Sequence, residues 1–299
     1  MSRGENEIAI VGLSAMFAGS SDVAAFWRDV IAATDRISDV PPTHWLIDDY
    51  YDPDPRAPDK TYCKRGGFLG SVAFDPLEFG MPPNALPATD TAQLLALIAA
   101  KRVLEDAART RTHEVDRDRI SVVLGVASTT ELVVAMGARL QAPVWRKALR
   151  EEGVPESEVT AICNRIAAHY PAWQEASFPG LLGNVVAGRI ANRLDLGGMN
   201  CVIDAACASS LAALELAIKE LRDGDSDLVI TGGVDALNDI MMYMCFSKTP
   251  AFSPTGDCRP FAHKPDGTII GEGAGLLALR RLGDAERILI DDPDDRPDV

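Results

Sequence analysis

The chain has 299 residues and a mass of 32.0 kDa, which suffices to bury a large core as one broad domain or two small ones. Hydrophobic residues make up 47% of the chain, no apolar stretch reaches the length of a membrane span, and no segment has the layout of a signal peptide, which indicates a cytoplasmic protein. A net charge of −15 without any basic stripe argues against a nucleic-acid partner.

The first predicted elements are a buried strand and an amphipathic helix. Residues 8–12 form an apolar run that ends in glycine, which is typical of a buried strand. Residues 23–33 have helical spacing, and we expect Asp22, directly before them, to be the N-cap. One side of this helix carries four large apolar residues: Phe26, Trp27, Val30 and Ile31.

The middle of the chain alternates between irregular and helical segments. Residues 38–90 are rich in proline and predict an extended surface excursion, after which residues 89–107 return to helical spacing. A second buried strand is expected over residues 120–126, followed by two helical stretches within residues 139–176.

Three more strands are predicted in the last third of the chain, over residues 200–204, 227–231 and 274–279. The first of them runs directly into a helix over residues 208–222, with Gly224 where a C-cap would fall. Short buried strands that alternate with helices indicate an α/β fold with a largely parallel sheet.

The six cysteines give no sign of a metal site or of a disulfide framework. No pair has CxxC spacing, and no cluster of histidine and cysteine suggests zinc. No strand–glycine loop–helix arrangement predicts a bound nucleotide either, so we expect neither metal nor cofactor. The glycines of residues 271–275 are better explained by close backbone packing beside the floor of an active site.

Cys207 has an unusual setting, between a strand and a helix and among small residues. A helical apolar stripe begins four residues after it and packs the helix into the core. Unpaired amides and the positive end of the helix dipole favour its thiolate form, and the backbone amides of Cys207 and Ala208 would stabilise an oxyanion. From these residues alone, Cys207 would equally well be a small side chain that fills a tight space.

Several motifs extend beyond this junction in a fixed order: residues 8–12 with Phe26 and Trp27, then residues 183–192, 204–211, 232–234, 253–261 and 266–275. Together they resemble the β-ketoacyl synthase family, the condensing domain of fatty-acid and polyketide synthases, over residues 7–287. Residues 59–68, 178–184 and 246–252 look closest to the ketosynthase domains of polyunsaturated fatty-acid and related polyketide systems.

This resemblance implies an α/β, thiolase-like fold, of which the chain would form the N-terminal half of a duplicated αβαβα architecture with helical and loop insertions. Residues 288–299 would be an acidic, disordered tail. Cys207 would take an acyl group from an acyl-carrier protein, whose phosphopantetheine bears the thioester, and a malonyl-carrier thioester would then be decarboxylated and condensed. Met242, Met244 and Phe246 would line the acyl pocket or belong to the core.

The family also implies a homodimer, with residues 200–204 at the contact, and two catalytic histidines in a C-terminal half. The one histidine downstream of Cys207 is His263, which matches neither histidine motif. We therefore expect this chain alone to be incompetent for complete condensation. His44 also lies outside any catalytic pattern, and a surface or packing role is expected for it.

Two alternatives remain open. Besides a ketosynthase fragment, the chain could be a non-catalytic partner similar to chain-length-factor proteins, or a thiolase-fold acyltransferase that uses coenzyme A thioesters. The retained Cys207 argues against the first alternative. The motifs around Arg189 and over residues 253–261 favour carrier-linked synthases over the second.

Overall fold

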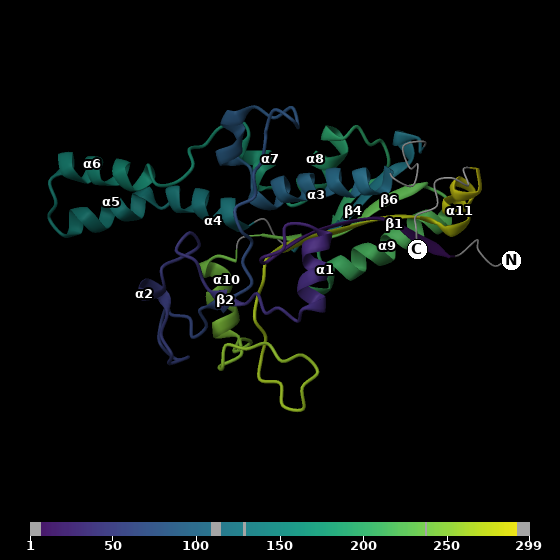
Figure 1. Cartoon of the computed structure of the whole chain (residues 1–299). Helices are drawn as coiled ribbons and strands as arrows, with labels where there is room; N and C mark the ends of the chain where they lie inside the picture. The colour runs from purple at the N-terminus through teal and green to yellow at the C-terminus, as the bar shows by residue number, and fades with distance from the viewer. Residues whose placement is uncertain (1–6, 109–114, 128–129, 237, 292–299) are drawn as a thin grey trace.

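The computed structural model describes residues 7–108, 115–127, 130–236 and 238–291. A five-stranded sheet with the order β1–β7–β6–β4–β5 lies at its centre (Figure 1). The strands are β1 (Ile8–Phe17), β4 (Ile120–Gly125), β5 (Asn200–Ile203), β6 (Leu228–Asp235) and β7 (Gly273–Arg281). A separate small sheet pairs β2 (Ser38–Asp39) with β3 (Arg65–Gly66).

The sheet is mixed, which corrects the expectation of a largely parallel one. β4 pairs in parallel with both β5 and β6, whereas β7 runs antiparallel to its neighbours β6 and β1. The register explains the reversal, because Asp235 at the end of β6 lies opposite Gly273 at the start of β7. The connection returns to the same end of the sheet, so β7 has to run back along β6.

Helices cover both faces of the sheet, which gives one helix–sheet–helix unit (Figure 1). On one face α3 (Thr91–Ala108) and α8 (Val185–Arg193) enclose the largest hydrophobic cluster. On the other face α9 (Ser209–Asp223) buries Ala213, Ala217 and Leu221 against β4, β6 and β7. Gly224 ends α9 in the left-handed conformation with φ 80°, as its position in the sequence predicted.

The excursion between β1 and α3 contains α1 (Val23–Ile31), α2 (Ile47–Tyr50) and η1 (Pro83–Ala88). Asp22 caps α1 as expected, since its Oδ1 accepts a hydrogen bond from the amide of Ala25 at 2.7 Å. The apolar side of α1 is open, however, with Trp27 61% and Ile31 69% exposed.

The connection from β4 to β5 begins with an arm that extends away from the sheet (Figure 1). It consists of α4 (Thr130–Arg139), α5 (Ala142–Glu151) and α6 (Glu156–Ala167), after which the chain returns to α7 (Ser177–Leu181), whose Gly180 carbonyl accepts from Gln93 of α3. After β6 the chain forms α10 (Ile240–Lys248), and after β7 it forms α11 (Leu282–Asp291). None of the described helices is both long and apolar enough to span a membrane.

The predicted boundary at residue 287 falls inside α11. The backbone of residues 288–291 continues this helix. Residues 292–299, the remainder of the predicted tail, lie outside the described residues.

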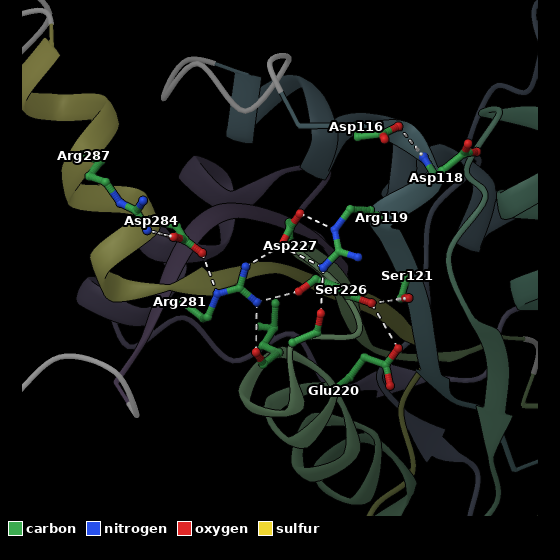
Figure 2. A network of polar contacts seen from close by, with 12 residues as sticks. Asp116, Asp118, Arg119, Ser121, Glu220, Ser226, Asp227, Arg281, Asp284 and Arg287 are labelled. Carbon is green, nitrogen blue, oxygen red and sulfur yellow. Dashed lines mark hydrogen bonds and ion pairs between the residues drawn. The ribbon is translucent and has the colours of Figure 1, made fainter. Parts of the chain in front are cut away.

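An ion-pair network closes the end of the sheet where β4 and β6 begin and β7 ends (Figure 2). Asp227 accepts hydrogen bonds from Arg119, with 2.5 Å between Nε and Oδ2, and from Arg281. Arg281 also donates to Asp284 and to the carbonyls of Leu221 and Ser226. We call these residues, Arg119, Asp227, Arg281 and Asp284, the far-end network. Their bonds join α9, β7 and α11 to the starts of β4 and β6.

Candidate active site

Cys207 lies at a sharp turn between β5 and α9. It is the middle residue of a single 3-10 turn, η4 (Ala206–Ala208), and its side chain is exposed. Ala206, directly before it, has a φ of 49°, a left-handed conformation that costs an alanine about 1 kcal/mol or more. Ser209 holds the turn closed, since its Oγ donates to the Ala206 carbonyl at 2.6 Å and accepts from the Ala205 amide at 2.9 Å. The strand-to-helix junction predicted for Cys207 is therefore present.

The two backbone amides expected to stabilise an oxyanion differ in availability. The Ala208 amide donates to the Ala205 carbonyl at 3.1 Å, so the prediction of a free amide at Ala208 is wrong. A 3-10 turn forms bonds between residues three apart and thus uses this donor. The Cys207 amide, by contrast, has no partner among the described residues. Of the predicted pair, it is the one amide left without a hydrogen-bond partner in the described part of the chain.

A cavity of about 510 Å³ opens beside Cys207. Its walls come from the ends of β4 and β6 and from the start of β7, and they include five glycines: Gly125, Gly233, Gly271, Gly273 and Gly275. Gly125 is needed for the approach of α9, because a Cβ there would lie 2.4 Å from the Ser210 nitrogen. Residues 271–275 form one side of the cavity, as their glycine spacing predicted. We call residues 271–275 the glycine wall.

Two carboxyl groups also line this cavity, Asp235 and Glu272. Burial works to raise the pKa of Glu272, but hydrogen bonds from His44 and from two backbone amides outweigh it and leave the pKa below its ordinary value. The pKa of Asp235 is raised, first by burial and then by the negative charge of Glu272. Glu272 is therefore ionised at neutral pH, whereas Asp235 binds its proton more tightly than an ordinary aspartate does.

His44 is the partner that the sequence did not connect with the site. Its side chain is 8% exposed, and its Nε2 lies 2.7 Å from Oε1 of Glu272. Of the two roles expected for it, packing is confirmed and a surface role is wrong. The two residues are 228 positions apart in the chain, so no local pattern reveals the contact. The placement of Glu272 among the glycines of the wall was the available signal.

The three candidates for an acyl pocket lie elsewhere. Met242, Met244 and Phe246 belong to α10, and none of them lines the cavity beside Cys207. The buried side of α10 carries Tyr243 and Ser247, four residues apart, so neighbouring positions face other directions. Phe246 packs on Phe252 with ring centroids 5.5 Å apart, in the third hydrophobic cluster.

A larger cavity, of about 880 Å³, lies next to the edge strand β5. Its lining includes Asn200 and Cys201 from β5 and Arg189 and Arg193 from α8. Burial and the nearby Arg193 lower the pKa of Arg189, whose Nε donates to Gln93 at 2.9 Å. No group of three or more His, Cys, Asp or Glu side chains suited to a metal ion occurs within the described ranges.

An exposed thiol on a strained turn between strand and helix, beside a glycine-lined cavity, is an arrangement suited to a cysteine nucleophile in covalent catalysis. The chain belongs to the β-ketoacyl synthase family, whose N-terminal domain matches residues 5–285. It is 40% identical over 283 residues to a polyunsaturated fatty acid synthase of Thraustochytrium sp., covering 95% of this chain and 10% of that protein.

Polyketide synthases show the same relationship. The chain is 32% identical over 285 residues to polyketide synthase PksL of Bacillus subtilis, covering 95% of this chain and 6% of that protein. A ketosynthase domain of the oxazolomycin system of Streptomyces albus superposes with a TM-score of 0.74 at 30% identity, over 94% of this chain and 43% of that one. The ketosynthase from module 6 of the bacillaene synthase of Bacillus subtilis gives a TM-score of 0.69 at 29% identity, over 94% and 41%.

These similarities confirm the predicted family and the thiolase-like fold. They also confirm the likeness to ketosynthase domains of polyunsaturated fatty-acid and polyketide synthases. The chain spans a tenth or less of the length of the two synthases and less than half of the solved ketosynthases. The matched family model is the N-terminal domain alone, as the motif order predicted.

Proposed function

We propose that this chain is the nucleophile-bearing part of a ketosynthase and that Cys207 accepts an acyl group from an acyl-carrier protein. The observation that carries the proposal is the exposed Cys207 thiol on its turn beside the 510 Å³ cavity. Sγ attacks the thioester carbonyl, the bond from that carbon to the pantetheine sulfur breaks, and the thiol proton passes to the departing sulfur. The Cys207 amide, which has no partner among the described residues, would stabilise the oxyanion formed on the way.

In a complete ketosynthase, the acyl group held on Cys207 would then condense with a decarboxylated malonyl-carrier thioester. The described lining of the cavity contains no histidine, which is the residue type that resemblance to the family assigns to those steps. We therefore propose that the isolated chain stops at the acyl-enzyme, in a reaction that needs no bound metal or cofactor of its own.

Intact-mass measurement after incubation with an acyl-carrier thioester tests this proposal. The expected result is one added acyl mass on the wild-type chain and none on Cys207→Ser. An unmodified wild-type chain whose Cys207 still reacts with iodoacetamide would overturn the proposal. A Cys207 inert to both reagents would favour the non-catalytic partner instead.

The donor distinguishes the remaining alternative. A carrier-linked synthase is expected to be acylated at least about ten times faster by the acyl-carrier thioester than by the same acyl group on coenzyme A, because the carrier adds its own contacts. Equal or faster transfer from coenzyme A would assign the chain to the coenzyme A-dependent acyltransferases.

We also propose that two copies associate through β5, in the cytoplasm. β5 is an edge strand with free backbone groups, and the 880 Å³ cavity beside it carries polar side chains such as Asn200 and Arg189. Sedimentation of the chain, with Asn200→Pro as the variant that removes a strand amide, tests the association. A monomer at tens of micromolar would contradict it.

A further inference from the structure

The glycine wall of the Cys207 cavity is held in two ways: Gly273 and Gly275 pair with β1 and β6 on both sides, whereas Gly271 and Glu272 lie before β7, outside the central sheet. Three of its five residues lack a side chain, and Gly271 precedes the first residue of β7. Backbone bonds join it to the excursion, since the Glu272 amide donates to Gly67 at 2.8 Å and the Gly67 amide donates to Ile270 at 3.0 Å. The one long side chain of the wall belongs to Glu272.

The carboxylate of Glu272 accepts three hydrogen bonds from three separate segments. Its Oε1 accepts from His44 Nε2 at 2.7 Å and from the Asn238 amide at 2.7 Å, and its Oε2 accepts from the Leu69 amide at 2.8 Å. The side chain is only 3% exposed. A buried carboxylate is stable only when donors of this kind surround it, so the wall and the three segments have to move together.

His44 is itself fixed from two further sides. Its Nδ1 lies 3.1 Å from Oγ1 of Thr43, and its ring meets Phe68 edge to face with centroids 5.0 Å apart. The imidazole therefore presents Nε2 to Glu272 in one orientation. Since Leu69 follows Phe68 directly, the bonds to Glu272 and the packing of His44 brace the same short stretch of chain.

We propose that Glu272 is a positioning residue for acyl transfer, which holds residues 271–272 of the glycine wall beside the Cys207 cavity through His44. The inference rests on the acyl-transfer function proposed for Cys207. Glu272 donates and accepts no proton in the reaction; it fixes the wall along which the thioester lies. Loss of the carboxylate leaves three donors without an acceptor and allows residues 271–272 to shift, and a displacement of about 1 Å can slow such a reaction about a hundredfold.

Two rates measured on the same thiol separate positioning from thiol chemistry. Octanoyl-pantetheine must lie along the wall to acylate Cys207, whereas iodoacetamide needs only an exposed thiol. Glu272→Gln keeps one oxygen acceptor but turns an amide group toward a donor. We expect this variant to be acylated about 10- to 100-fold more slowly than wild type. Its alkylation by iodoacetamide is expected to stay within about twofold.

His44 supplies the rescue test and a second route if Glu272→Gln folds poorly. His44→Gln retains an N–H donor at nearly the same place and is expected to keep acylation within about threefold of wild type, whereas His44→Ala is expected to lose about tenfold. Asp227→Asn in the far-end network is the control for general destabilisation. This variant removes another hydrogen-bonded carboxylate, at the opposite end of the sheet, and is expected to leave the acylation and alkylation rates unchanged.

Each outcome decides. Failure of the wild-type chain to be acylated removes the proposed function itself. A normal wild-type rate that is matched by Glu272→Gln or by His44→Ala overturns the positioning role alone. If Asp227→Asn slows acylation as much as Glu272→Gln does, and lowers the melting temperature by a similar amount, Glu272 has only a structural role. Slowing by Glu272→Gln and His44→Ala, with rescue by His44→Gln, establishes the inference.

Discussion

The two ends of the central sheet are held together in different ways. At the far end, Asp227 is bonded to two arginines that also reach backbone carbonyls, so the charges are paired (Figure 2). At the Cys207 end the walls are glycines, and the buried carboxylate Glu272 relies on a histidine and two amides. The far end is thus cross-linked by ion pairs, whereas at the Cys207 end the glycines leave backbone groups accessible to a substrate.

The acidic groups at the two ends of the sheet also differ in the direction of their pKa shifts. Hydrogen bonds from Arg119, and then from Arg281, lower the pKa of Asp227. Near the Cys207 end, burial raises the pKa of Asp235 and of Asp239, and it raises the pKa of Asp90 to about 6. The two ends are therefore expected to respond to pH in opposite directions.

The largest expected effect comes from a methyl group at the junction of β4 with α9. A Cβ at Gly125 would lie 2.4 Å from the Ser210 nitrogen and 2.5 Å from the Ser209 carbonyl carbon, and neither backbone atom can move without shifting the turn of Cys207. Gly125→Ala is expected to slow acylation about a hundredfold and to cost about 2 kcal/mol of stability.

Gly137→Ala, inside α4, is the matched control for that substitution. Nothing lies within 4 Å of a Cβ there, so alanine is expected to be neutral or to stabilise by up to about 1 kcal/mol. Acylation kinetics and thermal unfolding of the two variants provide the measurement. Normal acylation by Gly125→Ala would show that the turn tolerates displacement.

Asp90 is expected to give the largest pH effect. Its carboxylate caps α3 through the Ala92 amide at 3.0 Å and lies 3.4 Å from the Leu132 amide of α4. Because its folded pKa is raised from 3.8 to about 6, its contribution is fully present at low pH and is lost as pH rises through that window, by about 3 kcal/mol.

Asp90→Asn keeps an oxygen for the caps and removes the titration. Urea unfolding of both proteins between pH 4 and pH 7 gives the difference in free energy of unfolding. The free energy of unfolding of the wild type minus that of the variant is expected to fall as pH rises. A difference that is constant across this range would show that Asp90 ionises normally.

Asp227 is expected to behave in the opposite sense. Its lowered pKa contributes stability that is present above 3.8 and is lost as pH falls through the folded value. Since part of the group is open to solvent, we expect Asp227→Asn to cost about 2 kcal/mol at pH 7. Glu151→Gln, from the exposed pair with Lys147, is the control and should cost less than about 0.5 kcal/mol.

The smallest expected effect concerns the other end of α9. Gly224 has a φ of 80° but open space around its Cα, so Gly224→Ala meets strain without a clash and is expected to cost about 1 kcal/mol. Gly224→Asn should recover part of that loss, because asparagine tolerates the left-handed conformation. Unfolding curves of the three proteins test this. A loss as large as that of Gly125→Ala would remove the contrast between the two ends of the helix.

The features predicted from the sequence are those encoded by neighbouring residues. The Asp22 cap, the Gly224 cap, the strand-to-helix junction at Cys207 and the glycine wall each depend on a few adjacent positions. The reversed direction of β7 was missed because it depends on where a long connection returns. The bond between His44 and Glu272 was missed because it joins distant segments. The Ala208 amide was misjudged because a single 3-10 turn, rather than the first turn of α9, holds Cys207.

The most direct test uses the chain's own cysteines. Cys207, Cys245 and Cys258 are all exposed, so exposure alone would let a thioester reach each of them. After brief incubation with octanoyl-pantetheine, peptide mapping by mass spectrometry reports the acyl group at each position. The structure predicts acylation of Cys207 at least about ten times faster than of either other thiol, since Cys207 alone combines a strained turn, a cavity and an available amide. Equal labelling of the three cysteines, or a preference for Cys245 or Cys258, would contradict the central claim.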